Sequence, residues 1–459
     1  MLLSQGVNPN LQEADGNAPL HHAVSRGRVD VSAALLSAKA NVNAQNRLGR
    51  TALHMAFGTG PTVQKIDKTV DTSLVRLLLE RGANAVAPDQ YGVTPLHLSV
   101  LKADTALAME MLATGIDVEP RDRSGRTPLH HASSAADAAL VGSLISKGAS
   151  VSTTDARGWT ALDYLTWGSR KWDSSVAAQV RSSGRLLTDY GAAPALADLL
   201  VIGRDDAVTA ALDKDPSLVN KFLAKSPDGL KLLHLAVMVG DLEMCRSVLT
   251  RGANVNARSS DGRTPLHVAG ERAEAVPEIV RLLLDAKADV QAATVAVGLT
   301  PLHAAVVQRN TDVVNMLIAA GAKVNATASG VTPLLSFTAA ESMRATPSGP
   351  LIASALLGAS ANLNDTDVQG RSALHLAVIG RSEGLIDQFL AASADPNLKD
   401  RGGRTPLYMA VIDPDPKIGI VQKLLDAGAN PDARDSGGRS VIQAATAVGN
   451  EQIAAALKK

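Results

Sequence analysis

The chain has 459 residues, of which 46% are hydrophobic but only 2% are aromatic, and its 45 basic residues balance its 45 acidic residues. A formal net charge of zero excludes the overall basic character typical of proteins that bind nucleic acid or an anionic membrane surface. We therefore expect neither as a partner. No apolar run approaches the roughly 18 residues that a transmembrane helix needs. The scarcity of aromatic residues leaves Ala, Leu and Val to form the core, which favours short helices in close contact.

The only cysteine and the first residues of the chain bear on the cellular compartment. A single cysteine, Cys245, excludes an intramolecular disulfide framework, and its place in the apolar pattern LEMCRSVL predicts a buried, unreactive thiol. Residues 1–20 show no basic start followed by an apolar stretch, so they do not read as a signal peptide. We expect a cytoplasmic protein if Met1 is the true start, and otherwise leave the location unknown.

A four-residue pattern recurs along the chain about every 33 residues. In chain order it reads APLH at 18, TALH at 51, TPLH at 94 and 127, TALD at 160, PALA at 194, KLLH at 231, TPLH at 264 and 300, TPLL at 332, SALH at 372, TPLY at 405 and SVIQ at 440. These starts define thirteen units, some of them with insertions.

Each unit predicts two helices and a turn. Thr can cap the first helix, Pro suits its first position, and His three residues after the cap can bond back towards it, as Glu does in a capping box. A second helix follows, with leucine pairs such as Leu78–Leu79, and in many units it ends in a glycine such as Gly82, where a left-handed turn is expected. A polar stretch such as ANVNARSSDGR then predicts a tight turn.

These motifs resemble the ankyrin repeat over almost the whole chain. The resemblance implies an all-α repeat solenoid of stacked helix-turn-helix units with projecting hairpin loops. The unit at 160–193 has a poorly patterned second helix, and PALADLLVIGRDD after it looks like the start of a fresh array. We therefore predict two sub-arrays, residues 1–193 and 194–459, which either stack continuously or hinge.

Several departures from the repeat pattern lead to further expectations. Lys39, Lys287, Ser360 and Ser393 stand where other units have the terminal glycine, at a cost of roughly 1 kcal/mol each if the left-handed turn is kept. Insertions around GTGPTVQKID and ATPSGP fall between the two helices of a unit. The opening residues LLSQGVNPN match LLDAGANPD at 424–432, the tail of a unit. We therefore predict that the first array is N-terminally truncated or that its start codon was assigned too far downstream.

Catalytic and metal-binding motifs are missing from the sequence. There is no P-loop, GxGxxG, HExxH, CxxC or GxSxG pattern. Eight of the ten histidines occupy the capping position, and the adjacent pairs His21–His22 and His130–His131 diverge on a helix, which disfavours convergence on one ion. The sequons at Asn325 and Asn364 are treated as accidental. We expect no enzyme, no catalytic or metal-binding residues, and no cofactor.

The surface is the remaining candidate for function. In ankyrin proteins partners usually contact hairpin tips and the inner face of the first helices. This places Tyr91 and Trp159 at tips and Trp167 on the inner helix face. Aromatic side chains at such positions are favoured binding residues. The alternative is that the rings fill a gap at the junction of the two sub-arrays.

Arginine recurs just before the cap and suggests a second surface feature. The residues are Arg50, Arg126, Arg263, Arg371, Arg404 and Arg439, with Arg47, Arg123 and Arg401 nearby. Repetition at unit spacing would form a basic ridge able to attract an acidic segment. The alternative is that these arginines are ordinary solvated surface residues, because the sequence G-R-T is common in ankyrin repeats.

The sequence as a whole predicts a monomeric protein–protein interaction scaffold. A protein or peptide partner is expected to bind its concave face and hairpin tips, since a rigid solenoid loses little entropy on docking. The alternative is the targeting or substrate-recognition part of a larger protein whose effector or enzymatic domain lies outside this chain. An enzyme with an unfamiliar site is a third hypothesis, and it predicts a deep pocket with converging ionisable groups.

Overall fold

The computed structural model describes residues 7–58, 70–168, 174–272, 274, 276–343, 348–449, 453, 454 and 457. Within these ranges the chain consists of short helices and loops without a β-strand. The helices form two compact units, Met1–Val208 and Thr209–Lys459, called here the N-terminal array and the C-terminal array. A boundary near residue 193 stays a prediction.

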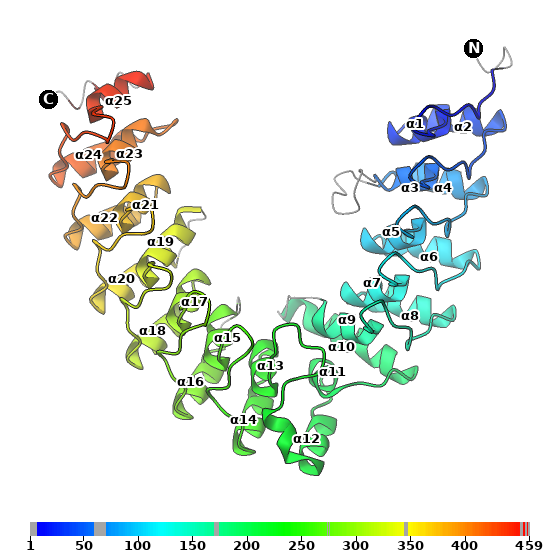
Figure 1. Cartoon of the computed structure of the whole chain (residues 1–459), viewed down its shortest axis with the longest axis horizontal. Coiled ribbons are helices and arrows are strands. Elements are labelled where there is room, and N and C mark those ends of the chain that lie inside the picture. Colours follow the sequence, from blue (N-terminus) through cyan, green and yellow to red (C-terminus); the bar gives the residue numbers. More distant parts are fainter. Residues whose placement is uncertain are drawn as a thin grey trace. The chain divides into compact units, whose positions relative to one another are not determined.

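The helices of the N-terminal array come in pairs of a first and a second helix (Figure 1). They are α1 (Pro19–Ser25), α2 (Val29–Ser37), α3 (Ala52–Ala56), α4 (Thr72–Glu80), α5 (Pro95–Leu101), α6 (Thr105–Ala113), α7 (Pro128–Ser134), α8 (Ala138–Ser146), α9 (Ala161–Trp167), α10 (Ser174–Asp189) and α11 (Leu196–Val201). Helix α12 (Asp205–Lys214) crosses from one array into the next.

The C-terminal array continues the same alternation. After the 3₁₀ helix η2 (Pro216–Asn220) come α13 (Leu232–Val239), α14 (Leu242–Thr250), α15 (Pro265–Glu271), α16 (Pro277–Asp285), α17 (Pro301–Val307), α18 (Thr311–Ala319), α19 (Pro333–Met343), α20 (Gly349–Gly358), α21 (Ala373–Ile379), α22 (Glu383–Ala391), α23 (Pro406–Ile412), α24 (Ile418–Asp426) and α25 (Val441–Ala447). The second helix predicted after α25 lies largely outside the described residues.

The thirteen predicted first helices are all present. Twelve begin at the predicted place, whereas the helix assigned to PALA begins one residue later than its alignment implied, with Ala195 as the N-cap. Asp198 then takes the place of the capping histidine, and its carboxylate accepts a hydrogen bond from the Ala195 amide at 2.7 Å. The predicted all-α repeat architecture is confirmed.

The predicted capping role of histidine is confirmed, and the structure adds a second contact for it. In α5 the Thr94 amide donates to His97 Nδ1 at 3.2 Å, and His97 Nε2 lies 3.1 Å from the carbonyl oxygen of Arg126, just before the next cap. Because Nδ1 accepts, the proton resides on Nε2, which donates to that carbonyl. The same bridge recurs at His21, His54, His130, His234, His267, His303 and His375. Each bridge joins neighbouring repeats.

Burial keeps these histidines neutral. It lowers the pKa of His54, His97 and His234 to about 4, although hydrogen bonds to the carbonyls of the next repeat act in the opposite direction. A charged imidazole would lose its hydration there and would place a proton on the nitrogen that accepts the cap amide. The bridge therefore depends on the uncharged ring.

Within each array the first helices stack on first helices and the second helices on second helices (Figure 1). Leu96, Leu129 and Leu302, which follow the cap and proline, are 0% exposed, so the first helices are buried on both sides. The long helix α10 brings Gly184 against Ile202, where an added Cβ would lie 2.1 Å from Ile202 Cγ2. Helix α11 therefore packs on the preceding repeat inside the N-terminal array.

The residues that replace the terminal glycine keep its backbone conformation. Lys39, Lys287, Ser360 and Ser393 have φ values of 65–66°. The left-handed turn is thus imposed by the stack and carries the expected cost for a residue with a Cβ atom. The first predicted insertion lies almost entirely outside the described ranges, as do residues 345–347 of the second, and the remaining part of the second provides the cap and first residues of α20.

A ladder of asparagine side chains links the ends of neighbouring repeats. Asn43 Oδ1 accepts from the Asn84 amide at 2.7 Å, and Asn43 Nδ2 donates to the carbonyl of Gly82 at 3.1 Å. Asn10 makes the equivalent contacts with Asn41 and Lys39. Residues 8–10 therefore occupy the place of a repeat tail, as their sequence suggested, while the truncation stays a prediction.

Candidate partner-binding surface

The loop before most first helices forms a tight turn, which we call a finger. In six fingers an Asp side chain accepts two backbone hydrogen bonds within the turn, as Asp122 Oδ1 does from the amides of Ser124 and Arg126 at 2.8 and 3.0 Å. Neighbouring fingers are joined by backbone hydrogen bonds, such as the one from the Arg123 amide to the carbonyl of Tyr91 at 2.7 Å. Where such bonds join neighbouring fingers within an array, the fingers stack in register and equivalent side chains lie in a column.

Arginines before the cap pair with the Asp of the same finger. Arg126 Nε donates to Asp122 Oδ2 at 2.8 Å, and the same pair joins Arg371 to Asp367 and Arg404 to Asp400. The three carboxylates are 1–8% exposed, whereas the three arginine side chains are 31–41% exposed. Although each pair is neutral as a whole, its cationic member faces the solvent.

Two other predicted arginines do not share this arrangement. Arg50 is 2% exposed, and its Nε lies 3.4 Å from Asp89 Oδ2 of the next finger. It belongs to the interior, because Asn46 replaces Asp in its own finger and offers no anionic partner. Arg263 is 19% exposed and contacts Asp228, Asp261 and Glu271 at 3.4, 2.7 and 3.1 Å. The predicted ridge is therefore discontinuous in these fingers.

The finger at 155–159 carries an aromatic cluster. The guanidinium of Arg157 lies 4.3 Å from the centre of the Trp159 ring, and that ring meets Tyr164 edge-on at 5.4 Å. Arg157 Nη2 donates to the Tyr164 hydroxyl at 2.6 Å, and this hydroxyl donates to Asp155 Oδ2 at 2.8 Å. Trp159 is half-buried, so its remaining face is held at the surface by a fixed set of neighbours.

Electrostatics reinforce this cluster. Burial raises the pKa of Tyr164, and its hydrogen bond to Asp155 raises it further. The pKa of Asp155 is lowered on balance, because hydrogen bonds from the Trp159 amide, Tyr164 and Arg157 outweigh the effect of burial. At neutral pH the cluster therefore holds an ionised carboxylate beneath a neutral phenol and an exposed guanidinium.

The other predicted aromatic residues lie elsewhere in the same array. Tyr91 is half-buried at the tip of the finger 89–93, and Trp167 is half-buried at the end of α9. No contact between the rings of Tyr91, Trp159 and Trp167 is recorded among the described residues, so the structure does not unite them in one cluster. Their binding role stays a prediction.

Two contacts of helix side chains with finger carboxylates were not foreseen. His131 Nε2 lies 3.3 Å from Asp122 Oδ2, and the Tyr408 hydroxyl donates to Asp435 Oδ2 at 2.6 Å. The histidine follows the Asp by nine residues, as Tyr164 follows Asp155. This spacing is a sequence signal that could have identified both pairs within a repeat. The contact of Tyr408 reaches the next repeat and has no such local signal.

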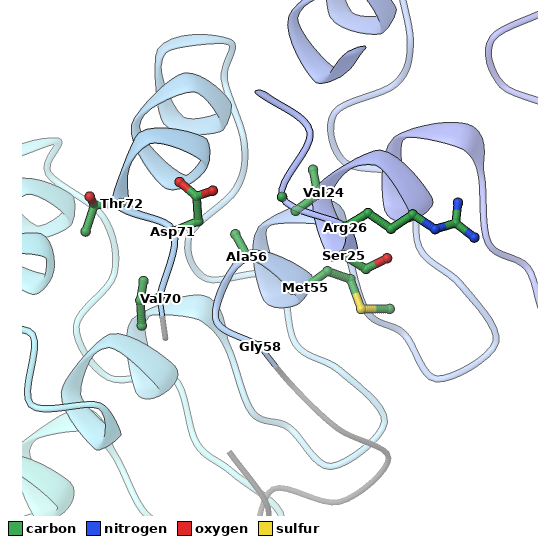
Figure 2. Close-up of a pocket in the computed structure, with 10 residues that line it drawn as sticks. Val24, Ser25, Arg26, Met55, Ala56, Gly58, Val70, Asp71 and Thr72 are labelled. Carbon is green, nitrogen blue, oxygen red and sulfur yellow. The ribbon is translucent and has the colours of Figure 1, made fainter. Parts of the chain in front are cut away.

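A hollow of about 780 Å³ opens where the turns of the first two repeats meet (Figure 2). Val24, Arg26, Met55, Asp71 and Thr72 are among the residues that line it. The Asp71 carboxylate caps α4 by accepting from the Leu74 amide at 3.1 Å, and Arg26 points away from it (Figure 2). The lining residues thus offer no converging set of ionisable groups.

Metal and membrane sites were also sought among the described residues. These residues contain no group of three or more His, Cys, Asp or Glu side chains placed to hold a metal ion. In the same part of the chain, no helix combines the length and the apolar character needed to cross a bilayer. Cys245 is buried, and burial raises the pKa of its thiol to about 12.

Comparison with known proteins agrees with this architecture. The family model for ankyrin repeats (three copies) matches residues 1–66, 63–155, 203–294, 233–328, 274–344 and 342–435. The tyrosine-protein kinase Shark of Drosophila melanogaster is 34% identical over 113 residues, which are 24% of this chain and 12% of Shark.

Two further relatives are named for NF-kappa-B. The NF-kappa-B p105 subunit of Gallus gallus is 35% identical over 119 residues, 26% of this chain and 12% of its own length. The NF-kappa-B inhibitor cactus of Drosophila yakuba is 35% identical over 99 residues, 21% of this chain and 20% of its own. The chain thus covers at most a fifth of these relatives. Since the ankyrin model spans most of its residues, the chain belongs to the ankyrin-repeat family, whose repeats generally serve as protein-interaction modules.

Proposed function

We propose that this chain is an interaction scaffold that binds a protein or peptide partner along its fingers and the adjoining ends of its first helices. The observation that carries the proposal is the cluster at 155–159, where a half-exposed Trp159 is fixed between Arg157 and Tyr164. A tryptophan immobilised before binding loses little entropy and offers a large contact area.

The proposed contact residues follow from exposure. They are Tyr91, Trp159, Trp167, Arg126, Arg371 and Arg404, with Arg263 at the margin because its charge is shared among three carboxylates. Arg50 is left out because it is buried. The scaffold needs no chemistry of its own, so its activity is binding alone.

A random peptide-display library provides the test. Selection on the full chain, with counter-selection on the Trp159→Ala/Trp167→Ala variant, is expected to yield peptides that lose at least about tenfold in affinity for the variant, as for typical hot-spot residues. A Tyr190→Ala variant is the matched control, since Tyr190 is 60% exposed and lies outside the fingers. Peptides that bind both proteins equally would refute the proposed site.

The alternative is that the array directs a larger protein to its target. The small share of Shark, p105 and cactus that the chain covers favours this candidate, because in those proteins the matched segment is a minor part of the whole. The intact mass of the protein from its native source tests it. A mass above that of 459 residues would support the alternative, and a mass equal to it would oppose it.

A further inference from the structure

The last three described fingers of the C-terminal array carry a column of arginines, the most regular one among the described fingers. They are residues 367–371, 400–404 and 435–439, and each ends in an arginine directly before a helix cap. In each one the arginine amide donates to the Oδ1 atom of the Asp four residues earlier at 2.9 Å. The arginines Arg371, Arg404 and Arg439 therefore have the same backbone placement.

The three fingers are also locked to each other. The Arg401 amide donates to the carbonyl of Gln369, and the Ser436 amide to the carbonyl of Gly402, both at 2.8 Å. Packed helical layers lie about 9 Å apart. The register thus repeats the guanidinium groups at roughly that interval along one edge.

The third arginine differs from the first two. Arg371 and Arg404 each use Nε to pair with the Asp of their own finger. In the last finger, Tyr408 occupies the capping-histidine position of its repeat, and its hydroxyl occupies Asp435 Oδ2 instead. Arg439 is exposed, and among the described residues its guanidinium forms no hydrogen bond or salt bridge, although its charge interacts with the Asp435 carboxylate through space.

We infer that this column binds an acidic peptide segment in the polyproline II conformation, with a carboxylate at every third residue. A polyproline II helix has three residues per turn and rises about 3.1 Å per residue, so every third side chain falls on one face about 9.3 Å apart. That interval matches the layer spacing of the fingers. The inference rests on the proposed function, because it names the chemistry of one partner segment.

A peptide suits this column better than a nucleic acid. Between residues 360 and 449 the aromatic side chains are Phe389 and Tyr408, which are 0% and 3% exposed. Bases therefore have no aromatic platform on which to stack, although stacking supplies much of single-strand affinity. Carboxylates match the forked donors of arginine, and the side chains of Asp367 and Asp400 are buried beneath their arginines, whereas Asp435 is half-buried.

Two labelled peptides of equal composition test the periodicity. One is four repeats of Glu-Pro-Pro, and the other has its four glutamates adjacent and its eight prolines adjacent. Fluorescence anisotropy with the full chain at low salt is expected to show at least about fivefold tighter binding of the periodic peptide, because three pairs form instead of one or two. Equal binding of both peptides would overturn the inference.

Variants test the residues. Arg439→Gln removes no hydrogen bond or salt bridge between described residues and is expected to weaken binding of the periodic peptide about threefold, as for one exposed ion pair. Tyr408→Phe frees Asp435 to pair with Arg439 and is expected to weaken binding in the same direction. Arg401→Gln is the matched control, because it removes an exposed arginine of a neighbouring position. Equal losses for Arg439→Gln and Arg401→Gln would refute the column.

Two further measurements distinguish this inference from nucleic-acid binding and from the proposed function. A 12-residue oligouridine is expected to bind at least about fivefold more weakly than the periodic peptide, and equal or tighter binding would overturn the peptide assignment. Peptides selected through Trp159 and Trp167 report on the proposed function alone. If they bind and the Glu-Pro-Pro peptide does not, the column fails while the proposed function stands.

Discussion

The finger at 155–159 in the N-terminal array and the finger at 400–404 in the C-terminal array share a backbone but present different surfaces. In both, an Asp accepts two amides of its own turn. Asp155 also receives the hydroxyl of Tyr164 and the guanidinium of Arg157, and Trp159 packs above them. Among the described residues, Asp400 has Arg404 as its one charged hydrogen-bond partner. One fixed turn thus supports an aromatic surface or a cationic one, depending on two or three side chains.

The largest expected effect concerns the histidine hydrogen bonds between repeats, which occur in both arrays. The stability of both should fall as the pH drops from about 6.5 towards 4, because the capping histidines have folded pKa values below that of the unfolded chain, which then binds more protons. Each of His54, His97 and His234, with a pKa of about 4, contributes a loss of about 2 kcal/mol at pH 5. Urea unfolding followed by circular dichroism at pH 7.5, 6 and 5 measures this loss.

A matched variant identifies the group responsible. Gln443 already replaces histidine in one capping box, where the Ser440 amide donates to its side-chain oxygen at 2.9 Å. His97→Gln should therefore show a smaller loss between pH 7.5 and 5 than the unmodified chain. Stability that stays constant over this range would contradict the neutral-histidine bridge in both arrays.

The second largest effect concerns the finger carboxylates. Asp155→Ala should cost about 3 kcal/mol, because it leaves two amides, the Tyr164 hydroxyl and Arg157 without their shared acceptor. Asp400→Ala should cost about 2 kcal/mol, since no helix side chain depends on it. Tryptophan fluorescence follows the first variant locally, because all three tryptophans lie between residues 159 and 172. Hydrogen exchange measures the effect of the second variant, Asp400→Ala. An equal loss in the free energy of unfolding for the two variants would contradict the proposed difference between the two fingers.

A transplanted side chain tests the aromatic surface directly. Trp159→Arg gives the N-terminal finger the residue of the C-terminal one and should cost about 1.5 kcal/mol, through loss of the edge-on contact with Tyr164 and the stacking of Arg157. Thermal unfolding followed by circular dichroism measures it, with Trp167→Arg as the comparison for a tryptophan without those contacts. A neutral result would show that the cluster does not fix Trp159.

The smallest effect is expected at the repeat ends. Lys39→Gly and Lys287→Gly should each stabilise their array by about 1 kcal/mol, because glycine adopts φ near 66° without strain. Gly252→Ala is the reverse control. Its φ is 83° and no atom lies within 4 Å of an added Cβ, so about 1 kcal/mol of destabilisation would reflect the backbone alone. Destabilisation by Lys287→Gly in urea unfolding would contradict this account.

The sequence by itself determined the repeat, its thirteen first helices and the capping role of histidine. These features are local: a cap, a proline, a histidine and an apolar face lie within one helical turn, so their spacing can be recognised directly in the sequence. The register slip at Ala195 marks the limit, because this unit has neither a hydroxyl at the cap nor the histidine three residues later that locates the caps Ala18 and Lys231.

Only the tertiary structure decided which of these residues reach the surface. Arg50 and Arg404 occupy the same position in their repeats, yet Arg50 turns to Asp89 of the next finger and is buried, while Arg404 pairs within its own finger and stays exposed. Whether the arginine is buried or exposed depends on the residue four positions earlier and on whether the neighbouring repeat supplies a carboxylate. The hydrogen bond from Tyr408 to Asp435 also depends on the stacking of neighbouring repeats. Such contacts join residues about 30 positions apart, so no local sequence pattern predicts them.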